Sequence, residues 1–411
     1  MEQFYKDPRT PVRMREGSLG EYVDAFAQQL SDQGYAKASA RYALQLVADL
    51  GRWLSWRRII AHQLTPERLA CYLGYRSRRR HCRSGDASIL RRLLNLLLEQ
   101  GIVAPVPPVE IAPAQRLAEE FRLYLQQERR LAPATVFHYL VFAKRFLAQC
   151  FADGEVRLDG LRADDVVGFV QQEAARLHHP KRSKLMATAL RSLLQYARYR
   201  GLISIDLRQC VPTVANWSMA SIPRTLSSDE VQRLLAHCDR HTAAGRRNWA
   251  ILLLLARLGL RAGEVVALAL EDLDWETGEL HIRGSDVDSD RLPIPHDVGA
   301  ALTDYLQQAR PTCSCRQVFV RMRAPHRGFA SSVAICCIVR RALDRAGLNP
   351  ALKGAHLLRH SLATQMLRQG ASLAEIGQLL RHRSQQTTTI YAKVDLDALR
   401  PLALPWPGGG R

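Results

Sequence analysis

Apolar residues in the first half of the chain recur three and four positions apart, which is the spacing of one face of an α-helix. Leu90, Leu93, Leu94, Leu97 and Leu98 form one such series, with polar residues between them. A helix with this pattern buries its apolar face and exposes the opposite face to water. The pattern predicts amphipathic helices packed around shared hydrophobic cores.

Residues that favour helix starts accompany this pattern. Ser18 with Glu21 fits a capping box, and so does Ser227 with Glu230. Thr65-Pro66-Glu67 combines a capping threonine with proline at the first helical position. We therefore expect helices to begin at each of these places.

The second half mixes helical and strand patterns. Residues 231–238 and 249–258 have helical spacing. Glu279 to Arg283 and Arg291 to Ile294 are short strand-like segments on either side of the polar stretch 284–290, which predicts a hairpin. The expected fold class is mainly α with a small β-hairpin or sheet (α+β).

An internal repeat organises the first half. The segment from Tyr35 resembles the one from Leu131, and Leu64-Thr-Pro-Glu-Arg-Leu resembles Leu161-Arg-Ala-Asp-Asp-Val. The repeat also relates Arg52-Trp-Leu to Arg145-Phe-Leu, and Gly101-Ile-Val to Gly201-Leu-Ile. These similarities predict two copies of one small helical module.

Proline-rich and glycine-rich stretches suggest the domain boundaries, because proline cannot continue a helix. Ala104-Pro-Val-Pro-Pro-Val separates the two copies, and a second linker runs from Val211 to Arg224. The predicted parts are two helical modules at 1–105 and 112–210, a third domain at 222–400, and a flexible tail at 401–411.

Charge points to a polyanionic partner. The chain has 58 Lys and Arg against 39 Asp and Glu, a formal net charge of +19. Binding to nucleic acid neutralises phosphates and releases counterions, so nucleic acid is the favoured partner and an anionic membrane surface the alternative. The apolar run from Trp249 to Ala256 is too short to span a membrane, and the first residues lack the apolar core of a signal peptide.

Cysteine usage fits a reducing, cytoplasmic environment. Nine cysteines are an odd number scattered along a long chain, which argues against a disulfide framework. Zinc ligation is an alternative for four of them, but their spacing fits no usual pattern: Cys313, Cys315, Cys336 and Cys337. We expect no metal and no cofactor.

Basic clusters occupy matching places in the two modules. They are Arg76, Arg78, Arg79, Arg80 and Arg83 in the first, and Lys181, Arg182 and Lys184 in the second. A single cluster of this kind is usually a solvated loop. Its recurrence favours contacts with the DNA backbone.

One ordered set of residues in the second half carries chemistry. Arg261 lies in Gly259-Leu-Arg-Ala-Gly-Glu264, followed by His356-Leu-Leu-Arg359, then His382, then Tyr391 nine residues later. This set resembles the tyrosine recombinase (phage integrase) family, and the resemblance covers roughly residues 223–399. Singly, each residue would be read as a surface or packing residue.

The resemblance implies a role for each residue. Tyr391 would attack the scissile phosphorus and form a phosphotyrosine link that stores the bond energy, so rejoining needs no ATP. Arg261 and Arg359 would bind the phosphate oxygens with their planar guanidinium groups. His356 would accept or share the tyrosine proton, and His382 would donate a hydrogen bond to the phosphate. Glu264 would orient Arg261.

Two positions depart from the family pattern. The hairpin normally carries a catalytic lysine, which is thought to protonate the leaving 5′ oxygen, but Ser285 stands there. The hairpin is also acidic, with Asp286, Asp288 and Asp290. Arg381 stands where the family commonly has glycine before the histidine. Arg283 or Arg291 would be the nearest cations, although guanidinium groups seldom release protons.

Three functions remain open at this point. The first is an active site-specific recombinase that moves mobile elements by integration or excision. The second is a DNA-binding subunit with weak or no catalysis because of Ser285, acting with a competent second recombinase subunit. The third is a type IB topoisomerase.

The partners follow from the same resemblance. The helical modules resemble the core-binding domain of the family, most clearly from about Ala114 to Leu207, and would clamp double-stranded DNA together with the C-terminal domain. The short helical stretch from Val394 to Arg400 would dock on a neighbouring protomer. This predicts assembly as a dimer to tetramer on DNA.

Overall fold

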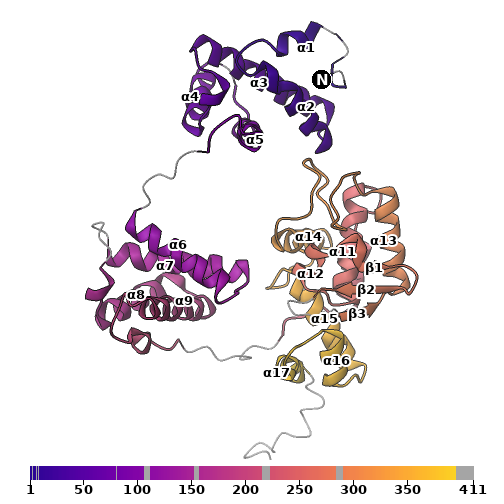
Figure 1. The fold of residues 1–411 in the computed structure, drawn as a ribbon. Coiled ribbons are helices and arrows are strands. Elements are labelled where there is room, and N and C mark those ends of the chain that lie inside the picture. Colours follow the sequence, from indigo (N-terminus) through magenta and orange to yellow (C-terminus); the bar gives the residue numbers. More distant parts are fainter. Residues whose placement is uncertain are drawn as a thin grey trace, which may run out of the picture. The chain divides into compact units, whose positions relative to one another are not determined.

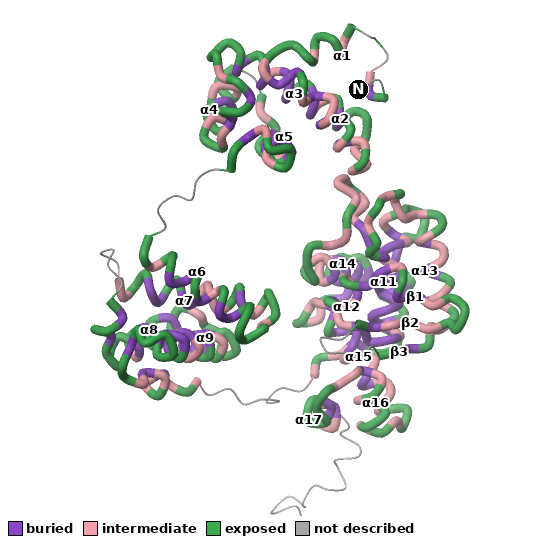
Figure 2. The backbone as a smooth tube through the Cα atoms, in the orientation of Figure 1, coloured by how far each residue is buried: buried purple, intermediate pink, exposed green. Residues whose placement is uncertain are grey.

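The computed structural model describes residues 1, 3–5, 7, 9–79, 81–105, 112–151, 157–214, 223–283 and 290–394, with the backbone alone at Val394. The chain divides into two compact units, 106–220 and 1–105 with 221–411. Three large hydrophobic cores lie within 4–103, 117–211 and 226–358. Buried positions follow the facing sides of the helices around each core (Figure 2).

Helices α2 to α5 enclose the first core (Figure 1). The elements are α1 (Arg9–Met14), η1 (Gly20–Tyr22), α2 (Val23–Asp32), α3 (Lys37–Trp56), η2 (Ala61–Gln63), α4 (Pro66–Ser77) and α5 (Asp86–Glu99). Leu90, Leu93, Leu94 and Leu97 of α5 are buried, as their spacing predicted. Leu98 only packs against this core from the side.

One of the predicted helix starts is wrong and two are confirmed. Ser18 caps no helix, and its hydroxyl shares a 2.9 Å hydrogen bond with Ser55. Thr65 does cap α4 by accepting a hydrogen bond from Arg68 N–H. Ser227 and Glu230 form the expected capping box.

The second core repeats the order of the first. Its elements are α6 (Pro113–Gln127), α7 (Pro133–Cys150), η3 (Leu158–Gly160), α8 (Ala163–Leu177), α9 (Pro180–Tyr199) and η4 (Leu207–Cys210). Gly101 after α5 and Gly201 after α9 both have φ of +71°, a left-handed conformation that glycine adopts without steric cost. In both places the next residue donates its N–H to a carbonyl five positions back, Leu97 or Ala197. The order of the elements and the glycine after the last helix thus recur in both segments, as expected for a repeated module.

An ion pair with reversed charges relates the two copies. Asp49 of α3 pairs with Arg76 of α4 at 3.0 Å, and Arg145 of α7 pairs with Glu173 of α8 at 2.8 Å. Alignment of the helix starts matches Asp49 with Arg145 and Arg76 with Glu173. The sequence comparison had matched Arg52 with Arg145, which is wrong by almost one helical turn.

The C-terminal part packs helices around the largest core. It contains α10 (Ser228–Ala236), α11 (Ala243–Arg257), α12 (Ala262–Ala267), η5 (Leu270–Asp272), α13 (His296–Gln308), α14 (Val333–Arg345), α15 (Ala355–Arg368), α16 (Leu373–Leu379), α17 (Gln385–Thr388) and η6 (Thr389–Val394). Helix α11 is buried almost all round because neighbours contact it on several sides, α13 most extensively (Figure 1).

A small antiparallel sheet completes this part, in the order β1 (Leu273–Asp274), β2 (Glu279–Ile282) and β3 (Asp290–Pro293). Leu280 pairs with Leu273 on one side and Leu292 on the other, and all three side chains enter the core. The predicted hairpin and the α+β fold class are confirmed. Strand β1 had not been predicted, because two residues are too few for a periodic pattern.

A separate small hydrophobic cluster contains Tyr391. Ala363 of α15, Ile376 and Leu380 of the α16 region and Tyr391 of η6 are buried together. This packing brings the C-terminal tyrosine to the face of α15. Among the described helices, none is long and apolar enough to cross a membrane.

Candidate active site

Arg261 lies directly before α12 and makes three hydrogen bonds, two to Glu264 and one to Arg381. Its backbone N–H donates to Glu264 Oε2 at 2.7 Å and its Nη1 donates to Oε1 at 2.8 Å. Its Nη2 donates to the carbonyl of Arg381 at 3.0 Å. The side chain is still 41% exposed, so the guanidinium keeps donors for a ligand.

Glu264 joins two arginines rather than one. Arg381 Nη2 donates to Glu264 Oε2 at 2.7 Å, and the Arg381 side chain is only 5% exposed. Burial alone would raise the pKa of Glu264, but Arg381 and Arg261 outweigh it and hold that pKa below its usual value. Glu264 is therefore an ionised positioning group.

Arg381 occupies a left-handed backbone position, with φ of +53°. It follows α16, and the adjoining His382 N–H donates to the carbonyl of Gly377 as in a glycine-terminated helix. The preference for glycine here has this conformational cause. An arginine at this position carries strain and adds a third guanidinium to the site.

Arg359 of α15 is buried, with 4% of its surface exposed. Its Nη1 and Nη2 donate to the carbonyls of Gly259 and Leu380. Burial, together with repulsion from Arg261 and Arg381, lowers the pKa of Arg359 to about 10. The guanidinium remains charged at neutral pH and links the segment before Arg261 to the end of α16.

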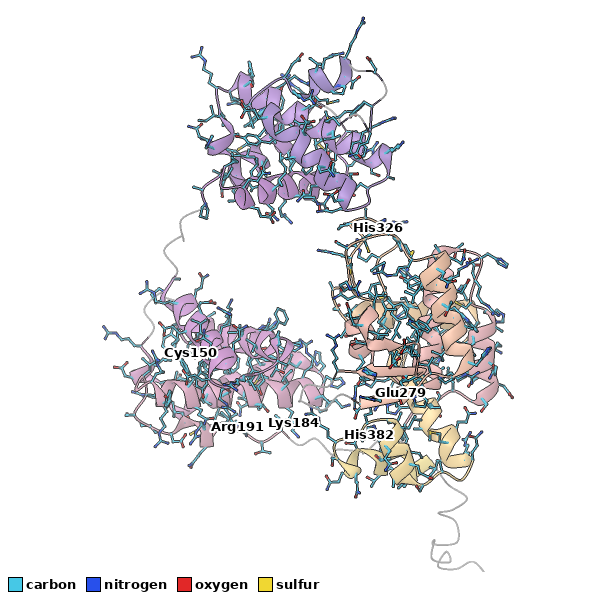
Figure 3. All side chains as sticks on the ribbon, turned by 45° about the vertical axis from the view of Figure 1, so that its right-hand side comes forward. Cys150, Lys184, Arg191, Glu279, His326 and His382 are labelled. Carbon is cyan, nitrogen blue, oxygen red and sulfur yellow. The ribbon has the colours of Figure 1, made fainter. Side chains whose placement is uncertain are left out.

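His382 packs against the predicted nucleophile. Its ring lies parallel to that of Tyr391, with 6.3 Å between centroids, and its Nδ1 shares a 2.7 Å hydrogen bond with Thr388 Oγ1. Figure 3 labels His382 on the segment after α16. Burial, then Arg359 and Arg261, lowers the pKa of His382 to about 4, so it is neutral here.

Tyr391 is 1% exposed, and its hydroxyl lies 2.9 Å from Nδ1 of His360. Burial raises the pKa of Tyr391, and Arg359 offsets part of that increase. Burial, His356 and Arg359 lower the pKa of His360 to about 4, so a neutral imidazole is available to accept the phenolic proton in a hydrogen bond.

His360 was not among the residues singled out from the sequence. The signal was present, because His356 and His360 are four residues apart and therefore share one face of α15. Their ring centroids lie 6.3 Å apart. His356 is the more exposed of the two, and partial burial with Arg359 and Arg261 lowers its pKa.

An open cavity of about 870 Å³ lies beside these residues. Arg261, His356 and His382 line it, whereas Arg359 and Tyr391 are buried. Its other lining residues include Arg283, Asp290, Ser332, Arg381 and Arg383. The structure thus gathers the five predicted residues into one region but leaves two of them out of the cavity wall.

The position expected for a catalytic lysine, Ser285, lies outside the described residues, as do Asp286 and Asp288. Of the two nearby cations, Arg283 lines the cavity and pairs with the buried Asp272 at 2.6 Å. Arg291 pairs with Glu279 at 3.6 Å.

The basic clusters differ in their surroundings. In the first module Arg76 is largely buried and pairs with Asp49. Arg79 and Arg83 each lie over a tyrosine ring. Arg78 is exposed, and Arg80 lies outside the described residues. In the second, Lys181, Arg182 and Lys184 are exposed. The sequence pattern predicts these three residues before the last helix of the module, but they lie within the first five residues of that helix, α9. Their contact with DNA stays a prediction, and Arg76 is the member whose geometry supports it least.

Within the described ranges, no group of three or more His, Cys, Asp or Glu side chains lies close enough together to hold a metal ion.

Comparison with known proteins places this geometry in a family. Residues 224–397 match the phage integrase family. A putative integrase/recombinase, y4rA of Sinorhizobium fredii, is 46% identical over 410 residues and covers 99% of both chains. The chain belongs to the phage integrase family of tyrosine recombinases. A second integrase-family relative from the same organism, y4rF, is 34% identical over all of this chain and 96% of its own.

Further integrase relatives are more distant. Tyrosine recombinase XerA of Pyrococcus furiosus is 29% identical and covers 69% of this chain and 91% of its own. The fold resembles the XerH site-specific recombinase solved with palindromic difH substrate in a post-cleavage complex, with a TM-score of 0.56 and 18% identity over 77% of this chain and 89% of that chain. It also resembles a lambda integrase dimer bound to a COC′ core site, with a TM-score of 0.50 and 16% identity, covering 67% of this chain and 94% of that chain.

Proposed function

We propose that this protein is a site-specific DNA recombinase that cuts and rejoins DNA through a covalent 3′-phosphotyrosine intermediate, for integration or excision of a mobile element. One observation supports the proposal most strongly. Arg261, His356 and His382 line the same cavity, and the ring of Tyr391 packs directly behind that of His382. These are the groups that phosphodiester transfer needs without a nucleotide cofactor: a nucleophile, cations and proton carriers.

The cavity suits a phosphodiester. Arg261 and Arg381 bring positive charge to it, and Glu264 fixes both guanidinium groups. A bound phosphate would find donors on Arg261 and His382, and its negative charge would raise the pKa of His382 from about 4, which favours the protonated, donating form. Phosphate binding would therefore favour the protonated form of His382, which can donate a hydrogen bond to a phosphate oxygen.

In the proposed cleavage step the Tyr391 oxygen attacks phosphorus while its proton passes to His356 or to water. The bond between phosphorus and the 5′ oxygen breaks, and the leaving 5′ oxygen takes a proton from water to become a hydroxyl. The 3′ phosphate is then joined to Tyr391, and the reverse attack by a 5′ hydroxyl restores DNA. Because one P–O bond replaces another, no external energy source is required.

Tyr391 must move before it can act. Its hydroxyl is buried against His360 and the residue does not line the cavity. The short η6 segment, Thr389–Val394, carries the tyrosine, so a rearrangement of this segment on DNA would bring the hydroxyl forward. We assign His360 the role of a positioning residue that holds the tyrosine in this resting arrangement.

A second candidate function is a DNA-binding subunit with little or no catalysis, working with a competent recombinase. Ser285 favours it, because a serine hydroxyl is a far weaker acid than the lysine expected there. Loss of a general acid costs about a hundredfold to ten-thousandfold in rate. Arg283, which lines the cavity, does not replace it, since a guanidinium seldom releases a proton.

A nicked suicide substrate separates these candidates, because loss of a short strand traps the covalent adduct. The target site must first be mapped by footprinting on DNA that the protein binds. The proposal predicts a protein–DNA adduct that Tyr391→Phe abolishes. If binding is retained but no adduct forms, alone or with a partner recombinase, the DNA-binding-subunit function replaces it. An adduct formed equally by Tyr391→Phe would show that Tyr391 is not the nucleophile.

A further inference from the structure

The first helical module carries an aromatic pocket beside its basic cluster. The pocket has a volume of about 290 Å³ and lies between α3 and α4. Its lining residues combine aromatic rings with guanidinium groups: Trp53, Trp56, Tyr72, Tyr75, Arg52, Arg76 and Arg79, with Asp49.

Trp56 is the exposed ring of this pocket, and the half-buried Tyr75 lies next to it. Trp56 is 67% exposed, and its ring centroid lies 6.3 Å from that of Tyr75. The guanidinium of Arg57 lies 5.1 Å from the Trp56 centroid, and that of Arg79 lies 4.7 Å from the Tyr75 centroid. An exposed tryptophan ring leaves a large apolar surface in water, so a planar ligand that covers the ring is favoured. The cations beside the ring favour a ligand that also carries negative charge.

A buried polar atom of this pocket also lacks a partner. The indole Nε1 of Trp53, a residue 8% exposed, has no hydrogen-bond partner among the described residues. Buried indole N–H groups usually find an acceptor. If Trp53 served only to fill the core, a phenylalanine there would avoid the free-energy cost of a buried N–H without a hydrogen bond.

The second module supplies an internal comparison. Alignment of the starts of α3 with α7 and of α4 with α8 matches Trp53 with Gln149 and Tyr75 with Gln172. Gln149 and Gln172 are both exposed and contribute no aromatic face. The aromatic pocket is therefore a feature of the first module and not a requirement of the shared fold.

We propose that this pocket binds an unpaired nucleobase of single-stranded or locally unstacked DNA. The base would stack on Trp56 and Tyr75, and Arg52 and Arg79 would contact the neighbouring phosphates. Base stacking on aromatic rings next to cations is the usual way in which proteins hold single strands without reading sequence. The guanidinium groups around the rings and the nearby exposed Arg78 favour DNA, because a polyanionic strand gains from each cation that neutralises a phosphate.

The proposal extends recognition beyond the duplex and does not depend on catalysis, so it is tested by binding alone. Fluorescence anisotropy with the full chain would compare a labelled oligothymidylate with an abasic strand of the same length. The two probes share phosphates and differ in bases. We expect tighter binding of the oligothymidylate, and about a tenfold loss with Trp56→Ala or Tyr75→Gln on that probe alone.

Matched variants keep the result interpretable. Tyr75→Gln installs the residue of the second module, Tyr75→Phe retains the ring and should retain binding, and Gln172→Ala should change neither probe. Equal affinity for the two probes would overturn the proposal. So would a loss with Trp56→Ala that is the same on both probes, or a defect only in protein assembly on duplex DNA, which would identify a protein-binding surface.

Discussion

The hydroxyl of Tyr391 lies 2.9 Å from Nδ1 of His360, inside a hydrophobic cluster and away from the cavity that Arg261 and His382 line. If Tyr391 is the nucleophile, as we propose, this position protects it from solvent and from premature reaction. Its release would then require that the hydrogen bond to His360 break and that η6 move.

His360→Ala tests this relationship. The substitution leaves the buried phenol without its acceptor, which costs the resting arrangement about 1–3 kcal/mol. We expect at least about fivefold faster adduct formation on a nicked substrate, measured by single-turnover gel assays, because the exposed arrangement of Tyr391 becomes more populated. Slower adduct formation with unchanged DNA binding would instead mean that His360 assists the chemical step.

Arg381 allows backbone strain to be separated from side-chain contacts. Arg381→Gly and Arg381→Ala both remove the 2.7 Å contact with Glu264, but only glycine relieves the φ of +53°. We expect the glycine variant to be more stable than the alanine variant by about 1 kcal/mol, seen as a higher midpoint in calorimetry. Equal midpoints would show that the left-handed conformation is not what favours glycine here.

Acidification should weaken the C-terminal part. The pKa values of His360 and His382 are about 4 in the folded chain, below the 6.5 of free histidine. The unfolded chain therefore binds more protons between these values, so the stability is fully present above about pH 6.5 and is lost as pH falls toward about 4. Urea unfolding followed by circular dichroism would show this loss.

The matched control for the pH effect is His360→Gln, which removes one of the titrating groups and retains an acceptor. Its urea midpoint should fall less steeply with pH than that of the unchanged chain. Parallel pH profiles for the two proteins would contradict the predicted role of His360 protonation in unfolding.

Ser285→Lys tests the missing general acid. With ordinary DNA we expect cleavage to accelerate by about a hundredfold or more, because lysine can protonate the leaving 5′ oxygen. A substrate with sulfur at the 5′ bridging position should not benefit, since a thiolate leaves without a proton. If Ser285→Lys speeds neither substrate, or both equally, the absent proton donor is not what limits the reaction.

Much of this architecture was predictable from sequence because its signals are local. Helical spacing predicted the series on α5, and the hairpin strands follow from alternation on either side of a polar loop. The ordered set from Arg261 to Tyr391 indicated the family correctly because several residues had to agree in order and spacing. The contacts that were missed are not local. Glu264 joins Arg381 across 117 residues, and His360 meets Tyr391 across 31.

The burial of Tyr391 together with a role in the site was not predicted from the sequence. Taken singly, Tyr391 would be interpreted as a core residue and Arg359 as a surface or packing residue, and only the packing of η6 against α15 determines how far each is enclosed. The Ser18 cap failed for a similar reason, because Ser55 of α3 offered its hydroxyl a tertiary partner.

The reversed ion pairs of the two helical modules have a consequence for folding. Tandem copies in one chain are prone to exchange of equivalent helices, since each helix fits either core. Here α4 placed against α7 would set Arg76 beside Arg145, and α8 placed against α3 would set Glu173 beside Asp49. Like charges at such close approach disfavour both hybrids. Because the acidic and basic partners are exchanged between the two modules, each helix forms its ion pair only with the helix of its own module.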